Sequence, residues 1–127
     1  MTPHDEQMYK ENILDHSQHP HNVGALAKCT IQHREFNPRC GDDIEFFLVT
    51  DERGIVTKTS FVGKGCAISQ ASASMLSDVL VGKSLSEIAA MGQKDILEML
   101  GIAVGPSRLK CALLSLKAVQ KGITPSH

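Results

Sequence analysis

The segment FVGKGCAISQASASMLSD covers residues 61–78, and within it the pattern of the chain changes from strand to helix. Gly63 and Gly65 precede Cys66, and glycine lets the backbone turn sharply because it has no side chain. From Cys66 onward, small and apolar residues recur with the helical period until Gly82. The pattern therefore predicts a strand that leads directly into a long helix, with Cys66 at the start of that helix.

Three runs before this junction have strand character, at residues 28–36, 44–52 and 55–63. The last two flank Arg53 and Gly54, a pair typical of a hairpin turn. Alternating apolar residues in the second run give it one clearly apolar face. We therefore expect an antiparallel meander with one face covered by helices.

Helical segments are expected on both sides of these strands. A first helix ends before Pro20, and Ser84 with Glu87 three residues later forms a candidate capping box for a short helix. Residues 94–100 form another helix, and Pro106 marks the start of the last one. The predicted fold class is α+β, a three-stranded antiparallel sheet with helices packed on one face.

The composition indicates one domain over residues 1–127, with 42% apolar residues and a net charge of -1. This charge argues against a nucleic acid partner, because such partners select a basic excess. No apolar run reaches the ~18 residues that span a bilayer, and the N-terminus lacks a signal-peptide pattern. We therefore expect a cytoplasmic protein without a membrane partner. Thiols stay reduced in that compartment, so four cysteines favour metal binding or reactivity over disulfides.

Three of the cysteines lie in settings that suit metal binding. Cys40 lies in the turn-rich stretch NPRCGDD, where Asp42 adds an oxygen donor. Cys66 and Cys111 lie near helix N-termini, whose unpaired N–H groups favour thiolate over thiol. The gaps between these cysteines are longer than the CxxC spacing of zinc ribbons. Spacing alone therefore leaves open both a shared metal site and scattered structural cysteines.

A helical wheel of the last helix places Cys111 away from its large apolar residues. Leu109, Leu113 and Leu116 share one face, and Cys111 points roughly the opposite way. We therefore expect Cys111 to lie outside the core.

Four blocks of the sequence resemble, in order, the iron-sulfur cluster assembly scaffolds of the IscU, SufU and NifU N-terminal type. They are YKENILDHSQHPHNVG, NPRCGDDIEFFL, FVGKGCAISQASASML and RLKCALLSLKAV. The resemblance implies the same three-stranded antiparallel sheet with helices against it. It also implies that Cys40, Cys66 and Cys111 ligate a transient [2Fe-2S] cluster or a zinc ion. Asp42 matches a family aspartate that is associated with cluster lability and, in zinc-bound forms, with ligation.

The resemblance further implies a scaffold that receives iron, takes sulfur from a cysteine desulfurase and passes the cluster to apo-proteins. We expect Cys111 or Cys66 to accept the persulfide, and we favour Cys111 because its helix face points outward. Lys110 beside it would stabilise thiolate and offset cluster charge. A homo-oligomer around a bound cluster fits this function.

Two alternatives stay open. The first is a zinc-dependent sulfur acceptor of the SufU type, a sulfurtransferase that relays persulfide sulfur. The second is an adapter module with a structural zinc ion.

The stretch VGPSRLKC differs from the resembling families before the third cysteine. IscU-type members carry a Leu-Pro-Pro-Val-Lys segment there, which a dedicated chaperone recognises, and only Pro106 and Arg108 match it. The resemblance therefore does not extend to chaperone-assisted release. Lys110 replaces the IscU histidine and resembles SufU, whereas the short stretch between Cys66 and Cys111 lacks the insertion usual in SufU.

The remaining candidates are interpreted as structural. Cys29 is expected in the first strand as a small apolar filler. An enzyme with Cys66 as nucleophile would need a histidine base, and none occurs between His33 and His127. Three histidines near the N-terminus are interpreted as helix-end and loop residues and not as ligands: His16, His19 and His21.

Overall fold

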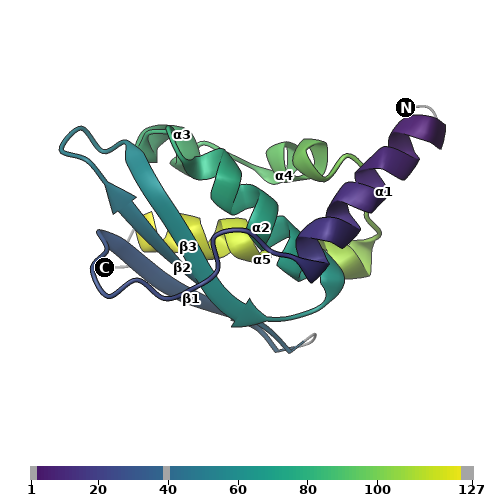
Figure 1. Cartoon of the computed structure of the whole chain (residues 1–127), viewed down its shortest axis with the longest axis horizontal. Coiled ribbons are helices and arrows are strands. Elements are labelled where there is room, and N and C mark those ends of the chain that lie inside the picture. The colour runs from purple at the N-terminus through teal and green to yellow at the C-terminus, as the bar shows by residue number, and fades with distance from the viewer. Residues whose placement is uncertain (1–2, 39–40, 124–127) are drawn as a thin grey trace.

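The computed structural model describes the backbone of residues 3–38 and 41–123 (Figure 1). One helix precedes three strands, and four helices follow them. The elements are α1 (Pro3–Gln18), β1 (Ile31–Asn37), β2 (Asp42–Thr50), β3 (Val56–Lys64), α2 (Ala67–Leu80), α3 (Leu85–Ala89), α4 (Gln93–Leu100) and α5 (Pro106–Ile123). The predicted α+β class is confirmed. Within the described ranges, no helix is both long and apolar enough to cross a membrane.

The three strands form one antiparallel sheet in the order β1-β2-β3. The register pairs Asn37 with Asp42 at one end of β1 and β2, and Asp43 with Lys64 at the same end of β2 and β3. The start of β2 therefore lies beside the end of β3, where the chain turns into α2. This register brings Asp42 close to Cys66.

The local signals in the sequence correspond to real turns and caps. Gly54 has a φ of 77° in the β2–β3 hairpin, a conformation that favours glycine. Ser84 and Glu87 form both hydrogen bonds of the predicted capping box at the start of α3. The first predicted strand begins later than expected, so Cys29 precedes β1 instead of lying within it.

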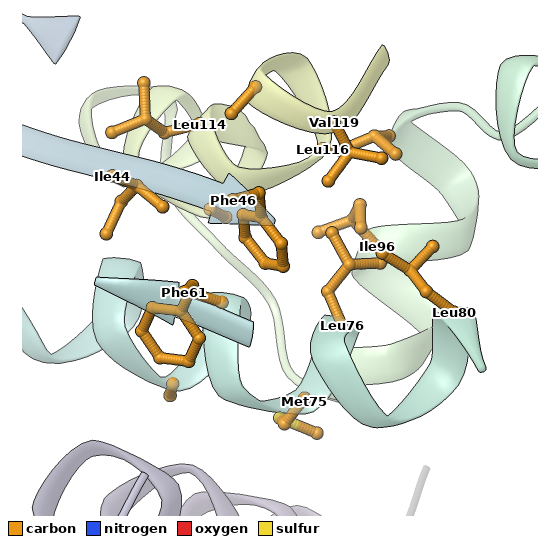
Figure 2. Packing of buried hydrophobic residues seen from close by; sticks show 14 of the residues in the cluster. Ile44, Phe46, Phe61, Met75, Leu76, Leu80, Ile96, Leu114, Leu116 and Val119 are labelled. Carbon is orange, nitrogen blue, oxygen red and sulfur yellow. The ribbon is translucent and has the colours of Figure 1, made fainter. Parts of the chain in front are cut away.

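The core lies between one face of the sheet and the helices (Figure 2). Ile44, Phe46 and Leu48 of β2 are almost completely buried, and the ring of Phe46 stacks on Phe61 of β3 with centroids 5.6 Å apart. Burying one such side chain contributes about 1.5–3 kcal/mol to the hydrophobic stabilisation. Leu76 of α2 and residues of α4 and α5 complete this cluster.

Helix α5 packs against the sheet on one side, where it contacts β1 and β2, and against α2 on another side. Small residues on α2 allow the close approach, and Ser72 Oγ donates a hydrogen bond to the carbonyl oxygen of Ala112 at 2.7 Å. Buried residues therefore extend around much of α5: Cys111, Ala112, Leu114, Ser115, Leu116, Ala118 and Val119.

The expectation that Cys111 points out of the core is wrong. Its exposed fraction is 3%. The helical wheel considered only large apolar side chains, whereas Ser115, one turn after Cys111, lies 3.3 Å from Ser72 of α2 through the two hydroxyl oxygens. The side of α5 predicted to face solvent therefore faces another helix.

Candidate metal centre

Cys66 is the N-cap of α2, as the sequence predicts for the strand-to-helix junction. Its Sγ accepts a hydrogen bond from the backbone N–H of Ser69 at 3.5 Å. The sulfur therefore lies over the first turn of α2, where unpaired N–H groups and the helix dipole favour negative charge. Cys66 is half-buried, so its thiol keeps partial access to solvent.

Asp42 holds this junction from the neighbouring strand. Its side chain is buried, with 1% exposed, and its Oδ1 accepts the backbone N–H of Cys66 at 2.9 Å. Its Oδ2 lies 3.8 Å from the Sγ of Cys66. A buried carboxylate with one oxygen directed at a thiol is a candidate hard ligand beside a soft one.

Cys111 reaches the same place from α5. One ligand atom each from Asp42, Cys66 and Cys111 lies within 4.8 Å of the other two. These residues come from β2, from the start of α2 and from the second turn of α5, so the fold brings together what the sequence separates. Ligand bonds to zinc measure about 2.0–2.3 Å, so small movements of the side chains would let these three atoms bind one ion.

Glycine provides the space for this arrangement. A Cβ at Gly65 would lie 2.6 Å from Asp42 Oδ1 and 2.9 Å from Ser69 Oγ. Any other residue would therefore displace the carboxylate or the hydroxyl. Within the part of the chain that the structure describes, Ser69 Oγ is buried without a hydrogen-bond partner. An unpaired buried hydroxyl on the same side of Gly65 as the Asp42 carboxylate fits a site that binds a polar or charged ligand.

The structure shows the positions of three of the four predicted ligands. Asp42, Cys66 and Cys111 come together, whereas Cys40 lies outside the described residues. Cys29 is not part of this cluster, and its Sγ lies 4.0 Å from Gln32 Oε1.

Lys110, the predicted electrostatic support, is exposed on α5. It lines a pocket of about 440 Å³ together with Phe36, Asn37, Pro38, Leu113, Leu114 and Lys117. The pocket is therefore lined by residues from the end of β1 and by residues of α5 on either side of Cys111 in the sequence.

Asp43 has a different environment from Asp42, although the two are adjacent. Successive residues of a strand point to opposite faces, and Asp43 forms an ion pair with Arg34 of β1. The hydrogen bond from Arg34 is the main cause that lowers the pKa of Asp43. Only Asp42 of the two is available to the thiols.

Gly65 and Ser69 are features of the site that the sequence did not single out in these roles. The sequence places them in a glycine turn and an alanine–serine helix, and both patterns also suit ordinary packing. Their role depends on Asp42 lying across from them, which follows from the β2–β3 register.

The chain is similar to known proteins over most of its length. The model of the NifU-like N-terminal domain family matches residues 8–125. The zinc-dependent sulfurtransferase SufU of Bacillus subtilis is 33% identical in an alignment 135 residues long, gaps included. The alignment covers 93% of this chain and 90% of that protein. The iron-sulfur cluster assembly scaffold protein IscU of Streptococcus pyogenes is 34% identical in an alignment 136 residues long. That alignment covers 94% of this chain and 84% of the other protein.

A solved structure has the same fold. The crystal structure of a Fervidobacterium islandicum AW-1 protein, assigned as an iron-sulfur cluster assembly scaffold of the SUF system, aligns with a TM-score of 0.79. The two chains are 23% identical, and the alignment covers 93% of this chain and 98% of the other. The family match and the two similar sequences show that the chain belongs to the NifU-like N-terminal domain family of iron-sulfur cluster assembly scaffold proteins.

Proposed function

We propose that the protein accepts iron and desulfurase-derived sulfur at Cys40, Cys66, Cys111 and Asp42, builds a transient [2Fe-2S] cluster and transfers it to apo-proteins. The observation that carries this proposal is the convergence of ligand atoms of Asp42, Cys66 and Cys111 within 4.8 Å. Cys40 enters because it stands two residues before Asp42 in the sequence. The partners of the protein are then a cysteine desulfurase and apo iron-sulfur proteins, in the cytoplasm where thiols stay reduced.

The donor set suits a cargo that must be released. Soft thiolates bind iron firmly, whereas a carboxylate oxygen is a harder and weaker partner for a sulfide-bridged iron. Three cysteines and Asp42 therefore hold a cluster less firmly than four cysteines. The backbone N–H of Cys66 donates to Asp42 Oδ1, which leaves Oδ2, 3.8 Å from the sulfur, as the candidate ligand oxygen.

Sulfur acceptance requires an accessible thiolate. The thiolate attacks the outer sulfur of the desulfurase persulfide, a new S–S bond forms on the scaffold, and the desulfurase cysteine leaves as a thiolate. Cys111 is buried and Cys66 is half-buried. We therefore propose Cys66 as the first acceptor of these two, since the preference for Cys111 depended on an exposure that the structure contradicts.

A zinc-dependent sulfur relay is the second candidate function. It is supported by the similarity to the Bacillus subtilis sulfurtransferase and by Lys110 at the position beside Cys111. In this function, zinc replaces the cluster on the same ligands and the chain transfers persulfide sulfur onward. The donor types, thiolate sulfur and carboxylate oxygen, also suit zinc.

Anaerobic reconstitution distinguishes the two functions. The full chain is incubated with ferrous iron, cysteine, a cysteine desulfurase and a thiol reductant, which supplies the electrons that convert sulfane sulfur to sulfide. The scaffold proposal predicts equal amounts of bound iron and acid-labile sulfide, visible absorption, and transfer to an apo-ferredoxin. Protein that binds no sulfide but carries labelled persulfide sulfur only when loaded with zinc would instead establish the relay.

A further inference from the structure

A second group of metal-ligating side chains lies at the other end of α2. His16 is in the last turn of α1, His21 follows in the loop, and Asp78 is in the last turn of α2. One ligand atom of each lies within 4.8 Å of the other two. Asp78 stands twelve residues after Cys66, which corresponds to about 18 Å along a helix. This group is therefore separate from the candidate metal centre.

We propose that His16, His21 and Asp78 form a second metal site that binds Zn²⁺ or a similar borderline divalent ion. Two imidazole nitrogens and one carboxylate oxygen suit zinc better than magnesium or calcium, which prefer oxygen ligands only. Three protein ligands leave one tetrahedral position for water or for a group from a partner.

His16 is oriented for ligation by its neighbour on α2. Its side chain is buried, and its Nδ1 lies 2.6 Å from Ser74 Oγ. When Nδ1–H donates a hydrogen bond to Ser74 Oγ, the lone pair of Nε2 is available to an ion. Histidines in metal sites commonly donate the N–H of their second ring nitrogen to a fixed oxygen in this way.

His21 and Asp78 are held by outer partners in the same way. The backbone N–H of His21 donates to Ser74 Oγ at 2.8 Å, and Asn22 Nδ2 donates to Asp78 Oδ1 at 2.8 Å. Asn22 adopts a φ of 55°, a left-handed conformation that asparagine tolerates. These contacts fix the loop and leave Asp78 Oδ2 directed at His21 Nδ1, 2.6 Å away.

Only a small movement is needed to admit the ion. Ligand atoms bound at about 2.0–2.2 Å in a tetrahedral site stand roughly 3.3–3.6 Å apart. His21 and Asp78 are about half exposed, so their side chains can move apart to this spacing between ligand atoms. The ring centroids of His16 and His21 lie 4.4 Å apart. The side chain of Asp15 adds negative charge near His16. A bound ion would connect the end of α1 to α2.

Zinc binding to a chain without the thiol ligands tests the proposal. Equilibrium dialysis with Zn²⁺ on the full-length Cys40→Ser/Cys66→Ser/Cys111→Ser variant should show one bound ion per chain. Adding Asp78→Asn or His21→Ala should weaken binding at least tenfold. Adding His19→Ala should leave it unchanged, because His19 is exposed and not part of this group.

Wild-type protein provides a second measurement in case the triple variant does not fold. At a free zinc concentration that just fills the wild-type sites, the wild type should bind about one ion more than the Asp78→Asn variant. Zinc should also raise the melting temperature of folded triple variant but not that of the same chain with Asp78→Asn. Absence of this extra ion, or an equal loss with His19→Ala, would overturn the proposal.

Discussion

Asp42 accepts the backbone N–H of Cys66 through Oδ1 at 2.9 Å, and its Oδ2 lies 3.8 Å from the sulfur of the same residue. One carboxylate therefore both orients a candidate ligand through its backbone and lies close to the sulfur of that ligand. This pairing connects the β2–β3 register to the chemistry of the site, because Asp42 is the first residue of β2 and Cys66 follows β3.

Replacing Asp42 by alanine should slow the loss of a bound [2Fe-2S] cluster severalfold. The variant removes the weak oxygen ligand, which is the donor that lets the cluster exchange onto an acceptor protein. Decay of the visible absorption under air or with a chelator measures the effect. Asp43→Ala is the matched control, because Asp43 pairs with Arg34 instead. An unchanged decay in Asp42→Ala would remove Asp42 from this role.

The same substitution should lower stability by about 1–3 kcal/mol, because it leaves the N–H of Cys66 without its carboxylate partner. Urea unfolding of the metal-free protein measures this separately from cluster decay. The two readouts therefore distinguish the structural role of Asp42 from its role toward the cargo.

Gly65→Ala should weaken metal binding at least tenfold while the fold is retained. The new methyl group would lie 2.6 Å from Asp42 Oδ1 and 2.9 Å from Ser69 Oγ, so the carboxylate must move. Competition with a colorimetric zinc chelator measures the affinity. Gly105→Ala is the control, since a Cβ there meets nothing within 4 Å. Equal affinity in Gly65→Ala and wild type would show that the close fit around Asp42 is not required.

Sulfur acceptance should depend on Cys66 and not on Cys29. Cys66→Ser should abolish most of the persulfide label transferred from a desulfurase, whereas Cys29→Ser should retain it, because Cys29 lies outside the ligand group. Labelled cysteine and mass spectrometry of the intact chain provide the measurement. Similar losses in both variants would refute the ligand assignment.

The sequence was sufficient to predict the elements that local chemistry determines. The hairpin at Gly54, the capping box of Ser84 and Glu87, and the helix that begins at Pro106 all occur as predicted. Each depends on neighbours within a few residues, so a pattern in the chain is enough to identify it.

The environment of Cys111 could not be predicted in this way. A helical wheel identifies one apolar face, but α5 is buried on two sides, and the second side consists of small residues that pack on α2. The proximity of His16 to Asp78 was missed for a related reason. Their distance depends on how α1 packs against α2, and no local signal near either residue reports it.

The acid stability of the fold should depend on Glu35, which connects β1 to α5. Its carboxylate lies 3.1 Å from Lys121 Nζ and 3.4 Å from Lys117 Nζ. Burial alone would raise its pKa, but hydrogen bonds from His33, Lys121 and Lys117 outweigh burial, so the pKa is lowered from 4.5.

A lowered carboxyl pKa stabilises the fold above the unfolded value and loses this contribution as the pH falls through the folded value. Glu35→Gln should therefore be less stable than wild type by about 1 kcal/mol at pH 7. The difference should shrink below the ordinary value of 4.5 and vanish in stronger acid. Urea unfolding across this range measures it, with Glu98→Gln as a surface control. A difference independent of pH would contradict the ion-pair explanation.

The most direct test of the shared site is X-ray absorption spectroscopy of zinc bound to the Asp78→Asn variant, which removes the proposed second site. We predict three sulfur ligands at about 2.3 Å and one oxygen ligand at about 2.0 Å, from Cys40, Cys66, Cys111 and Asp42. Adding Cys111→Ser should reduce the sulfur count to two. A sulfur shell that stays the same without the Cys111 thiol would contradict the claim that these residues hold one common ion.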